Sequence, residues 1–212
     1  MIVQEISDRF DYALKKSVSG LALDEYNKSL YLTKAQLEFV RNIVKVYEYT
    51  DEMRHILAPL VQTTTLNSGN FTQTADYYTT SDVLNNTVLE VVFERLNGSI
   101  PLIPLDHNDI HYTINNPFRS PNNKIAYRVT VDDEWRIYTD QTLTAYLYTW
   151  VKYPDPIVLE DFTGTDLEIS GVVVPTTSEL TDDVVIQIIS RAVDLSIKDI
   201  KNIAAPPAQE QN

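Results

Sequence analysis

The sequence predicts an α+β protein with a helical N-terminal part of two helices, an antiparallel β-sheet with a hairpin in the middle, and a C-terminal helix. Three observations lead to this fold class. Apolar residues recur at helical spacing near both ends of the chain. In the middle, apolar and polar residues alternate as they do in half-buried strands. Turn signals separate these stretches, and Asn97-Gly98 is the clearest of them.

The two N-terminal helices are predicted from periodicity and from helix-end signals. Residues 2–18 carry apolar side chains mostly at four-residue steps, and Gly20 can end this helix in a left-handed conformation. Thr33 and Gln36 form the pattern of a capping box, so we expect the second helix to begin there. It can continue until Pro59.

The middle of the chain begins with two predicted strands and a short helix. Residues 87–96 alternate weakly and read as a strand, and the Asn97-Gly98 turn leads into residues 100–105. Because prolines interrupt this second stretch, we expect an edge strand there. A short helix is expected over residues 107–114, after Asp106 as its cap.

A hairpin, a further strand and the last helix complete the predicted order. Residues 125–130 and 135–138 alternate on either side of the turn signal Asp132-Asp133, which indicates a hairpin. Residues 143–153 read as a strand throughout and can share a sheet with it. Thr181 is the expected N-cap of the C-terminal helix.

We expect a single domain over residues 1–203, because one sizeable core suits a chain of 212 residues. Residues 62–87 are rich in Thr, Asn, Ser and Gly, so they predict a long loop or arm. Residues 204–212 contain two prolines and are expected to form a disordered tail.

Composition excludes several functional classes. The net charge is −13 and residues 154–212 hold eleven acids against three bases, which disfavours binding to a phosphate backbone. The chain has no cysteine, so disulfides and thiolate chemistry are excluded, as suits synthesis in a reducing cytoplasm. No apolar run approaches the roughly 20 residues of a membrane-spanning helix, and the first residues do not form a signal peptide. We therefore expect a soluble protein.

His107 and His111 are the strongest candidates for chemistry. On a helix their four-residue spacing would place both rings on one face, with Asp106 or Asp109 as an oxygen ligand for a metal. The pattern is weak, because no Glu follows the first histidine and His55 lies elsewhere in the chain. We interpret the pair as ordinary surface and predict no metal site.

Acidic clusters and phosphate-binding motifs give no catalytic site either. Asp132, Asp133 and Glu134 fit a hairpin tip, and Asp182 with Asp183 fits the first turn of a helix, where the helix dipole favours negative charge. The five glycines form no phosphate-cradling loop and no nucleophile elbow. The prediction is a protein with no catalytic residue and no cofactor.

Residues 115–123 are the most informative segment. Two prolines restrict a polar loop that presents one aromatic residue and one cation, which suits docking against another protein, although a tight connector would have a similar composition. The thirteen tyrosines point the same way, since Tyr is enriched at interfaces as well as in strands. The candidate interface residues are Asn116, Pro117, Phe118, Arg119, Pro121, Tyr77 and Tyr78.

The order and spacing of several segments resemble structural proteins of crAss-like bacteriophages that infect Bacteroidales, in particular their ring or head-to-tail connector proteins. The likeness extends from about residue 8 to residue 200. The segments that carry it are residues 26–36, 116–121, 153–159, 179–180 and 189–195.

The resemblance implies a virion component in the neck or tail, assembled as a cyclic homo-oligomer with commonly twelve copies. Its implied partners are the portal and neighbouring ring or tail proteins, while viral DNA passes through the channel and no membrane is involved. Ring subunits need heterologous contacts on two flanks, which suits arms, rigid loops and many tyrosines. The acidic C-terminal quarter is a candidate lining for the channel.

Three other functions stay open from the sequence. The first is a tail adaptor, nozzle or fibre-attachment subunit of the same virion. The second is an enzyme, either a metal-dependent hydrolase that uses His107 and His111 or a nuclease of the packaging machinery. The third is a protein packaged inside the capsid.

Overall fold

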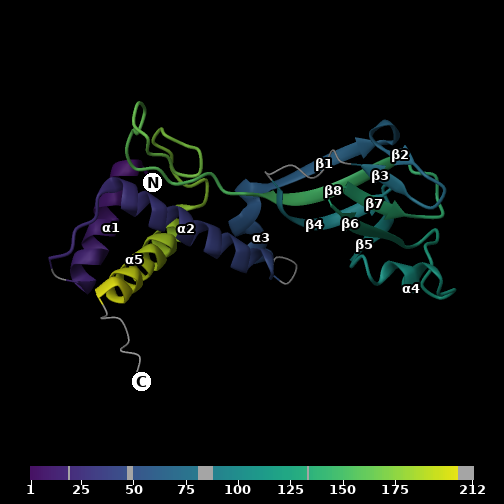
Figure 1. Cartoon of the computed structure of the whole chain (residues 1–212), viewed down its shortest axis with the longest axis horizontal. Helices are drawn as coiled ribbons and strands as arrows, with labels where there is room; N and C mark the ends of the chain where they lie inside the picture. Colours follow the sequence, from purple (N-terminus) through teal and green to yellow (C-terminus); the bar gives the residue numbers. More distant parts are fainter. Residues whose placement is uncertain (19, 47–49, 81–87, 133, 205–212) are drawn as a thin grey trace, which may run out of the picture. The chain divides into compact units, whose positions relative to one another are not determined.

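The computed structural model describes residues 1–18, 20–46, 50–80, 88–132 and 134–204 (Figure 1). The chain divides into two compact units. A helical unit comprises Met1–Leu60 and Pro154–Asn212, and a β unit comprises Val61–Tyr153. We expected one domain. In the structure, the N-terminal and C-terminal segments together form the helical unit, and the β unit is a continuous insertion between them. Residues 205–212, where we expected a disordered tail, lie outside the described residues, and Ala204 is the last residue of a helix.

The helical unit consists of α1 (Val3–Ser17), α2 (Glu25–Val44), α3 (Asp51–Leu57), a 3₁₀ turn (Ala58–Leu60) and α5 (Asp182–Ala204). The predicted first and last helices are confirmed. Ile6, Phe10 and Leu14 form the buried stripe of α1, at the four-residue spacing that places side chains on one face. Both α1 and α2 pack against α5, whose residues from Val184 to Val193 include most of its buried apolar side chains.

The predicted start of α2 is wrong. The helix begins at Glu25, where the Asp24 carboxylate accepts the Asn27 backbone N–H at 2.7 Å as an N-cap. Thr33 and Gln36 therefore lie inside the helix and form no capping box. The helix ends at Val44, and α3 is a separate element.

Thr33 and Gln36 share one face of α2 with Ser29, and this polar stripe binds the extended segment 155–159. The Ser29 and Thr33 hydroxyls accept backbone N–H groups of that segment at 3.0 and 3.1 Å. The Gln36 amide donates to a backbone carbonyl of the same segment at 2.7 Å. Residues 157–159 are buried, so their backbone groups need partners. α2 supplies those for Ile157 and Leu159, and Thr176 pairs with Val158.

The β unit contains one eight-stranded sheet in the order β1-β8-β4-β5-β6-β7-β3-β2. Its pairs are antiparallel except for β5 with β6, which is parallel, so the sheet is mixed and not purely antiparallel as predicted. The strands are β1 (Val61–Asn67), β2 (Thr72–Gln73), β3 (Tyr78–Thr80), β4 (Val88–Leu96), β5 (Ile100–Leu105), β6 (Ala126–Val131), β7 (Glu134–Tyr138) and β8 (Ala145–Lys152).

The predicted β4, the β6–β7 hairpin and β8 are confirmed, and the Asn97-Gly98 turn has the positive φ angles that its sequence indicates. The long loop expected over residues 62–87 is wrong in its first part. All seven residues of β1 pair with β8, and β2 and β3 occupy the other end of the sheet. Residues 81–87 lie outside the described residues.

Two further predictions about the middle of the chain need correction. β5 is not an edge strand, because its first residues pair with β4 and Leu102 to Leu105 pair with β6. The short helix is α4 (Ile110–Ile114), which begins four residues after Asp106 and packs Ile110 against Tyr127 and Val129.

The core of the β unit contains a buried polar network. The Glu94 carboxylate accepts the Arg128 Nε–H at 2.7 Å and also the Tyr146 hydroxyl. The Arg128 guanidinium lies 4.3 Å from the centroid of the Trp135 ring. Trp135, Tyr146 and Tyr148 pack together with ring centroids 5.3 to 5.9 Å apart. Burial and then the Glu94 charge raise the pKa of Tyr146, so its hydroxyl stays protonated as a donor.

Candidate interaction surfaces

The loop over residues 116–121 follows α4 and is folded around Asn116. The Asn116 side-chain oxygen accepts the Phe118 N–H at 3.0 Å. Its backbone carbonyl accepts the N–H groups of Arg119 and Ser120 at 2.9 and 2.8 Å. One residue thus holds three backbone donors of the loop, which fixes the position of Phe118 at its tip.

The same loop is tied to the sheet. Tyr127, a buried residue of β6, donates its hydroxyl to the Arg119 carbonyl at 2.6 Å. The Asn122 amide donates to the Ser120 carbonyl at 3.2 Å. These bonds support the rigid loop that the two prolines predict.

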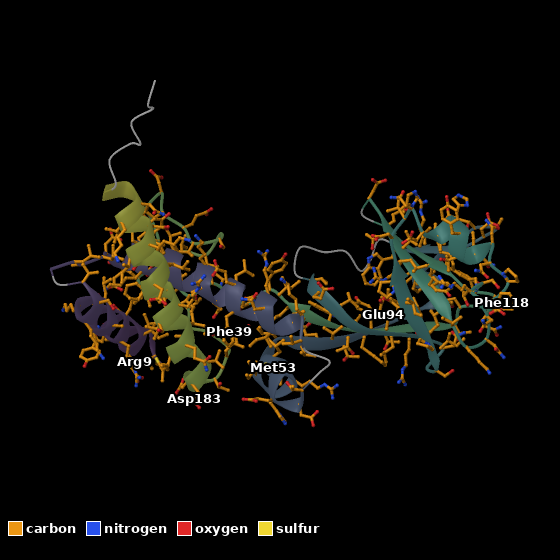
Figure 2. The ribbon with its side chains drawn as sticks, turned by 90° about the horizontal axis from the view of Figure 1, so that it is seen from below. Arg9, Phe39, Met53, Glu94, Phe118 and Asp183 are labelled. Carbon is orange, nitrogen blue, oxygen red and sulfur yellow. The ribbon has the colours of Figure 1, made fainter. Side chains whose placement is uncertain are left out.

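Large apolar surface is exposed on this rigid loop and on the helix before it. The Phe118 side chain is 94% exposed and lies at the periphery of the β unit (Figure 2). Tyr112 on α4 is 82% exposed and lines the same shallow hollow as Phe118 and Pro117. Arg119 is exposed and forms no ion pair with any residue that the structure describes. An exposed Phe fixed beside a free cation is typical of an interaction surface.

Tyr77, another of the candidate interface residues, lies close to this loop. Tyr77 and Pro121 line one groove, together with Tyr138 and the α4 residues Ile110 and Ile114. The Tyr77 and Tyr138 rings lie 5.3 Å apart, and burial raises the pKa of Tyr138. The structure thus brings Tyr77 and the proline-containing loop to the same side of the sheet.

Tyr78 points elsewhere. Its ring packs against the core of the β unit, and its hydroxyl accepts the Leu143 N–H at 3.4 Å. Tyr77 immediately precedes β3 and lines the groove, whereas Tyr78 is the first residue of the strand and turns its ring to the core. Of the seven candidate residues, Tyr78 is the one that the structure separates from the others.

The histidine pair does not adopt the helical geometry on which the metal hypothesis depends. Helix α4 begins at Ile110, so His107 precedes it and only His111 lies on it. Both line the groove beside Tyr77. Among the described residues, no three His, Asp or Glu side chains are grouped closely enough to hold a metal ion.

The acidic clusters occupy structural positions. Asp132 has a positive φ at the hairpin turn, and Asp133 lies outside the described residues. Asp182 begins α5 and pairs with the Met1 amino group at 2.6 Å. Both observations agree with the interpretation of these carboxylates as turn and helix-start residues.

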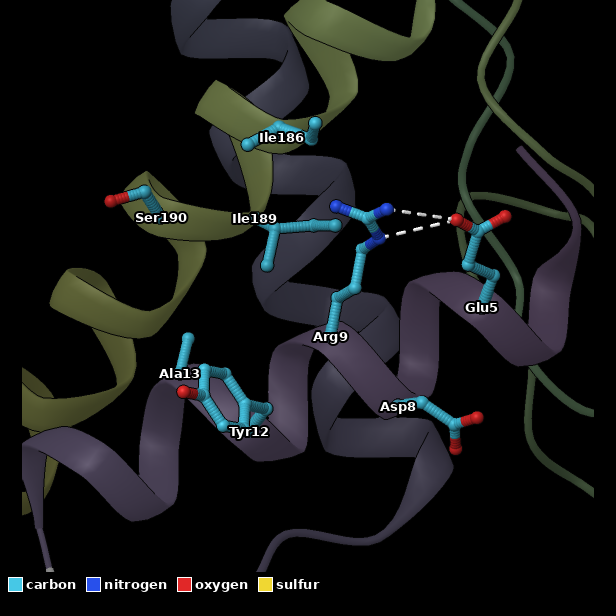
Figure 3. Close-up of a pocket in the computed structure, with 8 residues that line it drawn as sticks. All are labelled: Glu5, Asp8, Arg9, Tyr12, Ala13, Ile186, Ile189 and Ser190. Atoms are coloured by element: carbon cyan, nitrogen blue, oxygen red, sulfur yellow. Dashed lines mark hydrogen bonds and ion pairs between the residues drawn. The ribbon is translucent and has the colours of Figure 1, made fainter.

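A second surface, which the sequence reasoning missed, is a groove between α1 and α5 (Figure 3). Tyr12 of α1 is 73% exposed and lies outside the buried stripe of that helix. It lies two residues after the buried Phe10, which places it well away from that stripe. The groove is lined by Glu5, Asp8, Arg9, Tyr12, Ala13, Ile186, Ile189 and Ser190.

The helices that the structure describes include none that is both long and apolar enough to cross a membrane.

Comparison with known proteins identifies the family. The family model described as "Phage tail ring protein 3/4" matches residues 1–205. The chain is 30% identical over 220 residues to "Ring protein 3" of Bacteroides phage crAss001, with 93% of this chain and 95% of that protein covered. It is 26% identical over 219 residues to "Ring protein 4/5" of the same phage, with 92% of each chain covered. The chain therefore belongs to the phage tail ring protein 3/4 family and is a structural ring component of a virion.

Proposed function

We propose that this protein is the subunit of a closed ring in the neck or upper tail of the virion, where it joins the portal to the tail and surrounds the DNA channel. The observation that carries this proposal is how much of the chain the match to a known ring protein covers. The match to "Ring protein 3" includes 93% of this chain, so it extends over both compact units and over the exposed loop.

The proposed assembly is a cyclic homo-oligomer of twelve copies, synthesised in the host cytoplasm, with the portal and neighbouring ring or tail proteins as axial partners. A closed ring uses one surface of each copy to bind a different surface of the next. The rigid loop with Asn116, Pro117, Phe118, Arg119 and Pro121 is the proposed interface, together with Tyr77. Its exposed ring and its free cation have the chemistry of an interface centre.

The proposed role is mechanical and uses no catalytic residue, cofactor or metal. The relatives named above are ring proteins. His107 and His111 have neither the shared helical face nor a third ligand among the residues described.

The channel is proposed to be lined by acidic residues of α5, which would keep passing DNA from adhering. Only some of its carboxylates are suited to this role. Asp182 is paired with Met1, and Asp199 lies beside Tyr31, where burial and then the Asp199 charge raise the pKa of the phenol. Asp183 and Asp194 are exposed and share a face of the helix, since eleven residues are close to three turns.

Two measurements test the proposal. Native mass spectrometry and electron microscopy of the protein, alone and assembled on portals, should show closed rings of one copy number. A density map of the virion should then place the chain in the neck or upper tail. A position at a fibre base or inside the capsid would contradict the connector role, and a stoichiometric metal needed for turnover would contradict the mechanical role.

A further inference from the structure

The geometry points to a specific contact between neighbouring copies: Phe118 of one copy seats in the α1–α5 groove of the next, and Arg119 pairs with the acidic side of that groove. The inference rests on the proposed ring function and supplies the heterologous contact that a ring requires. It pairs the loop that is proposed above as an interface with the α1–α5 groove, which has no other assigned role.

The projecting surface is already organised for binding. Asn116 and Tyr127 hold the backbone on both sides of Phe118 through hydrogen bonds of 2.6 to 3.0 Å. Little conformational entropy is therefore lost when the ring of Phe118 is buried. The side chain is 94% exposed in the single chain, so nearly all of its apolar surface remains to be covered.

The receiving surface is apolar at its centre. Its volume is about 370 Å³, and Tyr12 and Ala13 of α1 face Ile186 and Ile189 of α5 across it (Figure 3). Tyr12 and Ile186 are exposed in the single chain. A pocket of this size suits one aromatic side chain, and Tyr12 offers a ring for edge-to-face packing.

Charge is complementary across the two surfaces. Residues 110–131 include no acid and three bases, although the whole chain has a net charge of −13. Arg128 is paired with Glu94 in the core, so the exposed bases are Arg119 and Lys124. The groove is lined by Glu5, Asp8 and Arg9, and Arg9 pairs with Glu5 at 3.0 Å. Asp8 accepts only an amide N–H, from Gln4 at 2.9 Å, and forms no ion pair among the described residues. It is therefore the carboxylate available to Arg119.

The same charges argue against symmetric contacts. A loop that packed on the loop of another copy would bring two basic surfaces together, and two grooves that met would bring together two surfaces with more acids than bases. Like charges brought together cost free energy, whereas the heterologous contact pairs opposite charges. The charges thus favour the arrangement that builds rings over one that builds dimers.

Disulfide trapping tests the contact directly, because the chain has no cysteine of its own. Phe118→Cys and Ile186→Cys variants are made separately, mixed during ring assembly and oxidised. We expect a covalent dimer that contains one chain of each variant. The double variant F118C/I186C should give a ladder of covalent oligomers up to the full ring. Phe93→Cys, at a partly exposed apolar residue of β4, replaces Phe118→Cys in the control and should give no such product.

A charge exchange provides the second arm. Arg119→Glu and Asp8→Arg should each lower the fraction of chains found in closed rings at least tenfold. The variant that combines both changes should recover most of the lost assembly. Arg95→Glu makes the same charge change at another exposed position of the β unit and should leave ring yield unchanged.

The outcomes separate this contact from the proposed function. If wild-type rings form but the mixed disulfide and the charge rescue both fail, the contact is wrong and the ring function stands. If the wild-type chain forms no ring, alone or on portals, the proposed function fails and the contact fails with it. A disulfide from Phe118→Cys to a different virion protein would also overturn the contact, because the groove of a second copy would not be its partner.

Discussion

The buried network around Glu94 gives the sharpest prediction about stability. Glu94→Leu removes the acceptor for both Arg128 and Tyr146 while it keeps a side chain of similar volume. The Glu94 and Arg128 side chains are only 5% and 13% exposed, so water cannot replace the lost carboxylate. Removal of one partner from a buried pair costs about 3–5 kcal/mol, since the other charge is left uncompensated. We expect the free energy of unfolding of the β unit to fall by about 4 kcal/mol.

The chain is well suited to this measurement. Both of its tryptophans, Trp135 and Trp150, are buried in the β unit, so tryptophan fluorescence during urea unfolding reports on that unit alone. With a denaturant slope of about 2 kcal/mol per M, the midpoint should move down by about 2 M.

Two variants make this prediction specific. Glu90→Leu changes an exposed glutamate of the same strand and should alter stability by no more than about 0.5 kcal/mol. The triple variant E94L/R128M/Y146F removes every polar group of the network and should recover most of the loss, because no buried charge stays unpaired. Equal midpoints for Glu94→Leu and Glu90→Leu would show that the network does not stabilise the unit.

Three further predictions concern single residues. The pKa of Tyr146 is raised in the folded protein, so the stabilisation by its protonated hydroxyl is complete below the ordinary value of 10.0 and is lost as pH rises above it. In Tyr146→Phe, the free energy of unfolding should therefore fall less steeply above pH 10. The slope should differ from that of the wild type by up to about 1.4 kcal/mol per pH unit. Lys28→Met should destabilise the helical unit by about 2 kcal/mol, because it leaves the Asp11 and Glu25 carboxylates facing each other, partly screened by water. Thermal unfolding followed by circular dichroism at 222 nm measures this loss, and an unchanged melting curve would refute it. Thr33→Val should cost the same unit about 1–2 kcal/mol through the lost hydrogen bonds to segment 155–159, and a melting temperature equal to that of the wild type would contradict this.

The fold class could be predicted because periodicity reports which face of an element is buried. The stripe of α1, the alternation of the β6–β7 hairpin and the Asn97-Gly98 turn are local properties, and the structure confirms all three. β1 was missed because its sequence, Val-Gln-Thr-Thr-Thr-Leu-Asn, has no clear alternation. Its conformation comes from pairing with β8, which is distant in the sequence.

The start of α2 shows a second limit. Ser, Thr and Gln bind free backbone groups at helix ends, and the same chemistry serves any extended segment that lies beside a helix. Thr33 and Gln36 bind segment 155–159, but their three-residue spacing is also that of a capping box, so the sequence pattern alone does not distinguish the two roles. Asp24, with Asn27 three residues later, was the better signal for the helix start.

The two candidate interaction surfaces also differ in how far the sequence can predict them. The loop around Phe118 is a continuous segment, and its prolines, aromatic ring and cation could be recognised from the sequence. The α1–α5 groove joins residues 5–13 with residues 186–190, so it exists only once the helices are packed. No pattern within either helix alone specifies it.

The insertion of the β unit between two parts of the helical unit has a consequence for the order of events during translation. Residues 61–153 leave the ribosome as one uninterrupted stretch and can acquire their final structure while the rest is still being made. α1 and α2 emerge earlier, but they can pack against α5 only after it has been synthesised. The end of α5 follows the end of the β unit by about 50 residues, or roughly 3 to 10 s at bacterial elongation rates. Until then the nascent polypeptide has no α1–α5 groove, so the contact proposed above cannot form before synthesis has reached the last helix.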